Sequence, residues 1–232
     1  MEARLDKVLS DAGYGRKEAK GLIGQGRVAV DGAVITRPEA RCAEDAVVTV
    51  DGTELCRGHI YLMLHKPAGV VSATADVRER TVLDLLPEDL RRRGLFPVGR
   101  LDKDTTGLLL LTDDGPLAHD LLSPRKHVDK TYLVTVDGVL DGADRAALAA
   151  GLMLGDGLRC QSAELDITGP NVGLLTIREG KYHQVKRMMA CLGKPVIALK
   201  RVAMGGLTLD ESLAPGQWRA LAAAETSILR EK

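Results

Sequence analysis

The segment over residues 99–115, GRLDKDTTGLLLLTDDG, most constrains the fold, because four consecutive leucines lie between glycines and aspartates. A short, continuous apolar run bounded by turn residues is typical of a strand buried on both faces. Beyond it, Asp113 and Asp114 precede a Gly-Pro pair, which predicts a turn and a helix with proline at its first position. The segment therefore predicts a central strand of a sheet, with polar loops at both ends.

Asp102 is the aspartate of this segment that we single out. It lies just ahead of the leucine run, between Arg100 and Lys103, where neighbouring cations can keep a carboxylate ionised at the rim of a sheet. Asp104 precedes two threonines and a glycine, and suits an ordinary turn. The pattern alone leaves Asp102 open between a catalytic carboxylate and a surface ion pair.

Composition places the chain among ordinary globular proteins. It has 232 residues, of which 45% are hydrophobic and 28% charged, and no apolar run approaches the roughly 20 residues of a membrane span. The first ten residues contain acids and lack the apolar stretch of a secretory signal. The cysteines are far apart and form no C-x-x-C pair, so we expect reduced thiols in a cytoplasmic protein, with no metal site: Cys42, Cys56, Cys160 and Cys191.

Positive charge is concentrated locally, although the formal net charge is zero. Residues 181–201 contain six lysines or arginines and no acid, and a second basic cluster consists of Arg125, Lys126, His127 and Lys130. Zero net charge argues against a general polyanion binder, whereas such patches can still bind RNA locally.

The first 57 residues predict a small α+β unit. Apolar spacing predicts a helix over residues 5–12, and a second helix begins near Arg16. Residues 26–32 and 46–52 each predict a strand followed by an Asp-Gly turn. Lys17, Lys20 and Arg27 form a basic surface there, which is either solvated charge or an RNA contact.

Residues 58–232 predict a second, larger domain. Strands are expected over residues 61–69, 130–138 and 173–180, and a helix over residues 182–195. A short helix within residues 82–94 ends in three arginines, a composition that favours the negative end of a helix over an RNA contact. Interspersed strands and helices predict an α+β fold with a mainly antiparallel mixed sheet flanked by helices.

Lys186 and Arg187 are neighbours on the helix predicted over residues 182–195, but they lie on different sides of it. At about 100° per residue, Lys186 flanks the apolar stripe, whereas Arg187 faces solvent on the other side. Lys186 can therefore pair with a partly buried carboxylate, and Arg187 is placed for a phosphate.

Several stretches resemble the pseudouridine synthases of the RsuA type, which modify ribosomal RNA. They are HKPAG, GRLDKDTTGLLLLTDDG, KTYLVTV and EGKYHQVKRMM. The first third, RLDKVLSDAGYGRKEAKGLIGQGRVAVDG, resembles the S4 RNA-binding domain that precedes the catalytic domain in these enzymes. One departure is Gly15, where the S4 pattern often has a capping serine, a change that costs roughly a few tenths of a kcal/mol.

The resemblance implies a catalytic role for Asp102 and an isomerisation of uridine. The N1–C1′ bond breaks, the uracil turns, and C5 joins C1′, with no metal or organic cofactor. An ionised carboxylate beneath the sugar suits an oxocarbenium-like carbon. The residues leave open whether Asp102 attacks C1′ or removes a ribose proton.

The same resemblance implies roles for the other candidates. Tyr132 would stack on the flipped base and take part in proton transfer at C5, while Lys186 pairs with the aspartate. Leu199 would pack on the tyrosine, and Arg100 would fill the gap that the flipped uridine leaves. The residues expected to hold phosphates are Arg187 and Lys200, together with Lys17, Lys20 and Arg27 of the S4 domain.

Three other interpretations compete with that of a pseudouridine synthase. A non-catalytic S4-type assembly factor is expected to lack the aspartate, tyrosine or lysine, and all three are present. An unrelated glycosidase needs a second carboxylate, for which Asp104 is the nearest candidate. A Ser-His-Asp triad of His119, Asp120 and Ser123 is discarded, because neighbours on one short helix point apart.

Substrate choice within the family also has two branches. The stretches GGLTLDESLAPGQWRAL and SPRKHVDKTYLVTV resemble the small-subunit enzyme of the uridine 516 class more than a 23S RNA enzyme. We therefore expect 16S ribosomal RNA, free or in a partly assembled small subunit, as the partner of a monomeric protein that binds no membrane.

Overall fold

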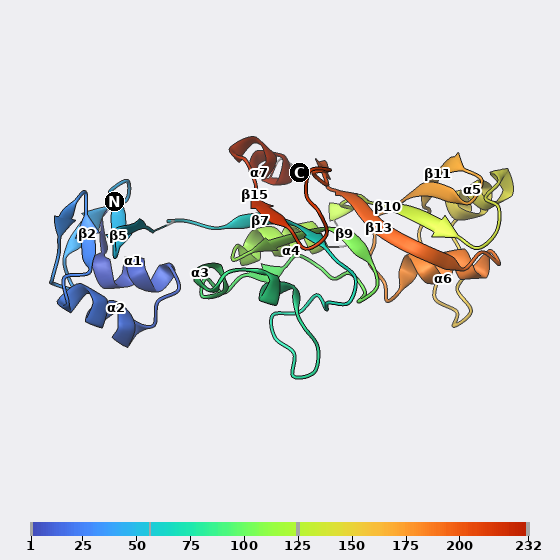
Figure 1. The fold of residues 1–232 in the computed structure, drawn as a ribbon. Coiled ribbons are helices and arrows are strands. Elements are labelled where there is room, and N and C mark those ends of the chain that lie inside the picture. Colours follow the sequence, from blue (N-terminus) through green and yellow to red (C-terminus); the bar gives the residue numbers. More distant parts are fainter. Residues whose placement is uncertain (1, 56, 124–125, 231–232) are drawn as a thin grey trace. The chain divides into compact units, whose positions relative to one another are not determined.

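The computed structural model describes residues 2–55, 57–123 and 126–230, so Cys56 and Arg125 lie outside the described residues. The chain divides into two compact units (Figure 1). The first unit consists of Met1–His59 with Leu86–Leu95, and the second of Ile60–Leu85 with Phe96–Lys232. The boundary predicted after residue 57 stays a prediction.

Among the described residues, the first unit combines three helices with short antiparallel strands; its two N-terminal helices and its strands agree with the sequence prediction. The turns after two of its strands place Asp31, Gly32, Asp51 and Gly52 at positive φ, the backbone of tight Asp-Gly hairpins. The sheet order is β3-β2-β5-β6, and a separate strand β1 pairs with β4. The elements are β1 (Glu2–Arg4), α1 (Leu5–Asp11), α2 (Arg16–Gly24), β2 (Val28–Val30), β3 (Ala33–Val34), β4 (Arg41–Ala43), β5 (Val48–Val50), β6 (Thr53–Glu54) and α3 (Glu88–Arg91).

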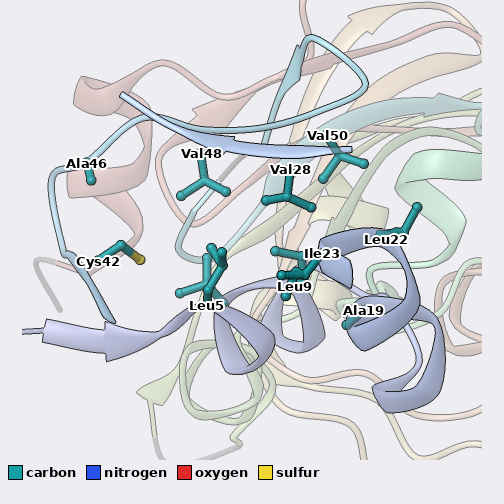
Figure 2. Close-up of a cluster of buried hydrophobic side chains, with 11 residues drawn as sticks. Leu5, Leu9, Ala19, Leu22, Ile23, Val28, Cys42, Ala46, Val48 and Val50 are labelled. Atoms are coloured by element: carbon teal, nitrogen blue, oxygen red, sulfur yellow. The ribbon is translucent and has the colours of Figure 1, made fainter. Parts of the chain in front are cut away.

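The core of the first unit lies between its two N-terminal helices and its sheet (Figure 2). Leu5 and Leu9 of α1 and Ile23 of α2 are fully buried and point toward Val28 and Val48 of the sheet. The apolar positions that predicted the helices are therefore the positions that build this core. The basic residues of α2 lie on the opposite, exposed side.

One nine-stranded sheet forms the second unit. Its main path is β11-β12-β10-β13-β9-β7-β15, while β14 pairs with β13 and β8 with β9. All pairings are antiparallel except that of β13 with β9, so the predicted mainly antiparallel mixed sheet is confirmed. The strands are β7 (Tyr61–Lys66), β8 (Phe96–Pro97), β9 (Thr106–Thr112), β10 (Lys130–Val136), β11 (Glu164–Gly169), β12 (Val172–Ile177), β13 (Val196–Met204), β14 (Leu207–Thr208) and β15 (Trp218–Ala220).

The predicted leucine strand is β9, and it is central to the sheet. Residues 107–112 are all buried, with β7 on one side and β13 on the other. Gly107 has φ +104°, and a Cβ there would lie 2.2 Å from the carbonyl oxygen of Arg201. Only glycine therefore allows β13 to approach the start of β9, immediately after the loop that carries Asp102.

Helices pack on this sheet and complete the core. Leu121 of α4 and Leu229 of α7 join Met63, Leu108 and Leu110 in one buried cluster. The helical elements are η1 (Val82–Leu85), α4 (Gly115–Leu122), α5 (Gly142–Ala150), α6 (Gln184–Cys191) and α7 (Ala223–Arg230). No helix among the described residues is long and apolar enough to cross a membrane.

Two helix starts differ from the predictions. Helix α4 begins at Gly115, so Pro116 is its second residue. Helix α6 begins at Gln184, because His183 takes a left-handed conformation with φ +48°. Tyr182 and His183, which the sequence placed inside the helix, therefore lie just before it.

Asp114 is a structural residue, as the capping pattern predicted. Its side chain accepts a hydrogen bond from the Leu117 amide (3.1 Å) at the start of α4. It also accepts one from the Tyr61 hydroxyl (2.6 Å) and lies 3.3 Å from the Arg230 guanidinium of α7. One buried carboxylate thus joins the first strand, helix α4 and the last helix of the unit.

Replacing Asp114 with alanine is expected to lower the free energy of unfolding by about 1–3 kcal/mol. The reason is that the substitution removes the helix cap and leaves the Tyr61 hydroxyl without this acceptor. Urea unfolding monitored by circular dichroism measures the change. The matched control is Asp120→Ala, on the exposed side of the same helix, with an expected change within about 0.5 kcal/mol. Equal effects of the two substitutions would contradict the assignment.

Candidate active site

A cavity of about 720 Å³ opens at the rim of the sheet of the second unit, beside the loop between β8 and β9. Asp102 of that loop and Tyr132 of β10 both line it, and Arg100 lies at its edge. A narrower recess of the same region adds Lys186 and Leu199. The structure therefore brings together five residues that the sequence predicted for the site, from three distant parts of the chain.

Lys186 is the cation nearest to Asp102. Its Nζ lies 3.1 Å from Asp102 Oδ2 and 2.6 Å from Asp104 Oδ1. Partial burial favours the neutral amine, but the hydrogen bonds to the two carboxylates outweigh it and raise the pKa of Lys186. The hydrogen bond from Lys186 likewise lowers the pKa of Asp104. A charged lysine thus bridges the side chains of Asp102 and Asp104 at this rim.

The two aspartates differ in their exposure. About a quarter of the Asp102 side chain is exposed, against three quarters of the Asp104 side chain. His183 adds a second contact to Asp102, with Nε2 3.5 Å from Oδ1. Asp102 is therefore the carboxylate that faces the cavity, and Asp104 lies outside it.

Lys66, at the end of β7, fixes the backbone of the Asp102 loop from behind. This side chain is fully buried, and its Nζ donates to the carbonyl oxygens of Pro67 (3.0 Å), Asp102 (3.0 Å), Lys103 (3.3 Å) and Thr105 (2.9 Å). Burial lowers the pKa of Lys66 to about 8, against the opposing effect of Asp104 and Asp102. Three main-chain carbonyls of the loop, those of Asp102, Lys103 and Thr105, are thus tied to one ammonium group.

The residues that follow Lys66 complete this cradle. The Gly69 amide donates to the Lys103 carbonyl (2.8 Å). The Ser72 hydroxyl donates to the Leu101 carbonyl (3.0 Å) and accepts from the Leu101 amide (3.1 Å). The stretch HKPAG and the residues that follow it therefore hold the Asp102 loop through hydrogen bonds with the main chain of the loop.

Two buried cations form another wall of the cavity. Lys130 and Arg201 are 8% and 1% exposed and both line it. Lys130 donates to the Val128 carbonyl (2.9 Å), and Arg201 Nε donates to the Leu108 carbonyl (2.8 Å). Among the described residues, Arg201 Nη2 has no hydrogen-bond partner. Burial and the repulsion from the neighbouring Arg201 lower the pKa of Lys130. A negatively charged ligand at this wall would offset that repulsion.

The structure corrects the predicted placement of Arg187 and locates Lys200. Arg187 does not face solvent, because three quarters of its side chain is buried and its Nη2 lies 2.5 Å from Asp156. Lys200 lies on the face of β13 opposite to Leu199 and Arg201, since successive strand residues alternate. Lys200 is not among the residues that line the cavity, and its contact with a phosphate stays a prediction.

In the first unit, Lys17 and Lys20 are exposed on α2 as predicted. Arg27 is also exposed, but it forms a double hydrogen bond with Asp51, with Nε 2.8 Å from Oδ1. Arg92 pairs with Glu88 and Glu18 within the same unit, in agreement with the interpretation of the arginine run as structural. Lys17 and Lys20 are therefore more available for contact with a phosphate than Arg27 and Arg92, which are paired with carboxylates.

Sequence reasoning missed four residues of the site: Lys66, His183, Tyr182 and Arg201 as a cavity residue. Lys66 lies within the strand predicted over residues 61–69, where a lysine in an otherwise apolar strand indicates a buried partner. His183 and Tyr182 were placed inside a helix. No local pattern indicates a left-handed histidine, because that conformation depends on surrounding contacts. Among the described residues, no group of His, Cys, Asp and Glu could hold a metal ion.

Comparison with known proteins agrees with this arrangement. A family model described as RNA pseudouridylate synthase matches residues 60–191, and an S4 domain model matches residues 3–48. The cavity lies in the first of these segments and in the strand that follows it. The chain belongs to the RNA pseudouridine synthase family, whose members isomerise uridine in RNA, and it carries an S4 domain. The resemblance to the family and the enzyme class are thereby confirmed.

Relatives match over nearly the full chain. The chain is 46% identical over 235 residues to the uncharacterized RNA pseudouridine synthase YtzG of Bacillus subtilis (strain 168), with 98% of each protein covered. It is 41% identical over 226 residues to ribosomal small subunit pseudouridine synthase A of Escherichia coli (strain K12), with 96% of this chain and 97% of the relative covered.

A solved crystal structure of a pseudouridylate synthase is also similar. It has a TM-score of 0.71 and 37% identity, and covers 97% of this chain and 99% of its own. This chain therefore resembles a pseudouridylate synthase in its fold as well as in its sequence.

The buried ammonium of Lys66 predicts a pH dependence of stability. The folded pKa of about 8 lies below the usual value of 10.5, so between these pH values the unfolded state binds more protons than the folded state. The contribution of Lys66 to the free energy of unfolding should therefore rise with pH across this window, by up to about 1 kcal/mol per pH unit.

The measurement is urea unfolding of wild type and Lys66→Met from about pH 7 to about pH 11, a range that brackets the two pKa values. The difference between the two proteins should increase from pH 8 to pH 10.5. A difference that stays constant over this range would mean that Lys66 has an ordinary pKa. Lys103→Met, which changes an exposed lysine of the loop that carries Asp102, controls for general effects of charge.

Proposed function

We propose that this protein converts a single uridine of 16S ribosomal RNA, of the uridine 516 class, to pseudouridine. The observation that carries the proposal is the cluster of Asp102, Lys186, Tyr132 and Leu199 in one recess at the sheet rim. The small-subunit branch is supported by the relatives called ribosomal small subunit pseudouridine synthase A, of which the Escherichia coli protein is 41% identical.

Asp102 is proposed as the catalytic residue. Lys186 and His183 both contact its carboxylate, and an ionised carboxylate stabilises positive charge at C1′ as the N1–C1′ bond breaks. Attack on C1′ and removal of a ribose proton both need the same ionised group. In either route C5 then bonds to C1′, the C5 proton leaves, and N1 gains a proton, so the atoms of uracil are conserved.

Tyr132 and Leu199 are proposed to hold the base. Tyr132 is buried, and its ring lies in the same recess as Leu199. A stacked ring fixes the uracil while it turns, and the phenol is the group proposed to assist the loss of the C5 proton. Arg100 is exposed at the rim and is proposed to occupy the place of the flipped uridine in the RNA.

RNA backbone contacts are proposed at two places. In the second unit, the buried cations Lys130 and Arg201 supply positive potential inside the cavity. In the first unit, the exposed Lys17 and Lys20 are proposed to contact phosphates, with Arg27 in a smaller part because Asp51 neutralises it. These contacts suit ribosomal RNA in the cytoplasm, free or in a partly assembled small subunit.

A glycosidase that uses Asp104 as its second carboxylate is not supported. Both aspartates contact the same ammonium group, and a general acid needs a raised pKa, whereas the pKa of Asp104 is lowered. Asp104 therefore suits the role of a second anchor for Lys186.

Asp102→Asn is expected to abolish pseudouridine formation while RNA affinity and folding stay close to wild type, because the change removes charge with little change in shape. The measurement is tritium release from 16S and 23S transcripts labelled at uridine C5. The matched control is Asp104→Asn, which should keep turnover within about tenfold of wild type since Lys186 still pairs with Asp102.

The outcomes separate the alternatives. Release from 16S RNA that is lost only in Asp102→Asn supports the proposal. Release from 23S RNA alone would assign the protein to the large-subunit branch. Absence of release from both transcripts and from partly assembled subunits would favour an RNA-binding assembly factor.

Lys17→Ala with Lys20→Ala is expected to weaken RNA binding and to reduce its salt dependence by up to about one unit of slope per lost phosphate contact. Filter binding at several salt concentrations measures both quantities. Lys7→Ala is the control, since Lys7 is an exposed lysine of α1 that pairs with Asp11. An unchanged slope in the double variant would show that RNA lies on another surface.

A further inference from the structure

An aromatic stack lies beside the cavity, immediately before α6. The rings of Tyr182 and His183 are nearly parallel, with centroids 3.8 Å apart and an interplanar angle of 17°. His183 is the inner member, with Nε2 3.5 Å from Asp102 Oδ1, whereas Tyr182 is 76% exposed. One face of the tyrosine ring is thus covered by imidazole, and the other is open to solvent.

This exposure is unusual for the chain. It has four tyrosines, one phenylalanine and one tryptophan, all of which the structure describes. The other five side chains are buried or half-buried, and Tyr182 alone is exposed. An isolated exposed ring needs no explanation by itself. Its place at the mouth of the cavity, on top of a residue that contacts Asp102, makes a role at the site the better explanation.

The segment that carries the stack is held in place by polar contacts. The Lys181 amide donates to Gln184 Oε1 (2.9 Å), and Gln184 Nε2 donates to the buried Glu179 (2.6 Å). Arg187 donates to the Tyr182 carbonyl (3.3 Å), which gives this arginine a structural role. The left-handed φ of His183 is sparsely populated for residues other than glycine and persists where surrounding contacts impose it.

We propose that the outer face of Tyr182 binds a nucleobase of the RNA strand, on a nucleotide adjacent to the target uridine. This inference rests on the proposed function, in which a uridine leaves its stack and enters the cavity. Its neighbour then loses a stacking partner, and an aromatic ring at the cavity mouth replaces it. Stacking on tyrosine accepts any base, so Tyr182 contributes affinity and register and little sequence preference.

The geometry also gives the stack a positioning role. The bound base, Tyr182, His183 and Asp102 form one continuous series, in which the base is separated from the carboxylate by two side chains. A fixed separation of this kind holds the neighbouring nucleotide at a set distance from Asp102. The target ribose is thereby brought to the carboxylate in a defined register.

Single-turnover tritium release tests the proposal through two kinetic quantities. Tyr182→Ala should raise the RNA concentration for half-maximal rate by about 5- to 150-fold, and leave the rate at saturation close to wild type. Tyr182→Phe keeps the ring and should behave as wild type in both quantities. A lower saturating rate with an unchanged half-maximal concentration would overturn the proposal, since Tyr182 would then act only by supporting His183.

A binding measurement tests the stack without turnover. In the Asp102→Asn background, RNA fragments carry 2-aminopurine at the 5′ or the 3′ neighbour of the uridine that releases tritium. We expect fluorescence quenching for one of the two fragments, lost with Tyr182→Ala and retained with Tyr182→Phe. Equal fluorescence of the alanine and phenylalanine variants on both fragments would overturn the proposal.

Failure of the proposed function is distinguishable from failure of this inference. If neither transcript releases tritium, the affinities of wild type, Tyr182→Ala and Tyr182→Phe for full 16S and 23S transcripts are compared directly. Weaker binding of the alanine variant alone would support the stack while the assigned reaction fails. Equal affinity of all three proteins would overturn the stack as well.

Discussion

The site depends on one buried ammonium group. Lys66 Nζ contacts four carbonyl oxygens, three of them on the loop that carries Asp102. An unpaired buried charge is costly, so the loop is held in the one conformation that solvates the lysine with main-chain oxygens. Lys186 acts on the same loop from the other side, through the carboxylates of Asp102 and Asp104. Two lysines with different partners thus determine where the candidate catalytic carboxylate lies.

The sheet makes this arrangement possible by bringing distant segments to one rim. Strand β9 is central, with β7 beside it and β13 parallel to it on the other side, and Gly107 permits the close approach of Arg201. Because β10 pairs with β13, Tyr132 lies opposite Arg201 and near Leu199. The register of three strands therefore sets the wall of the cavity, and a one-residue slip would turn these side chains to the opposite face.

Local pattern was sufficient for much of the fold. Apolar spacing predicted α1, α2 and the alternating strand β10, and the Asp-Gly pairs predicted two hairpin turns, because these features depend on neighbours in sequence. It failed at His183, whose left-handed backbone ends the helical pattern, and at Arg187, whose partner Asp156 lies on a distant turn. Both depend on contacts between segments far apart in the chain, which no window of sequence contains.

The sequence by itself determined the family, the mixed sheet and the identity of the candidate residues, since residue types at fixed spacing carry that information. Only the tertiary structure decided which of these residues meet. It added Asp104 to the predicted pair of Lys186 and Asp102, put Lys200 on the face of the sheet opposite to Leu199, and paired Arg27 with Asp51. It also put Lys66 beneath the loop and stacked Tyr182 on His183. The physical reason is that partner, burial and backbone conformation are properties of the packed chain, because each requires groups that only folding brings within contact distance.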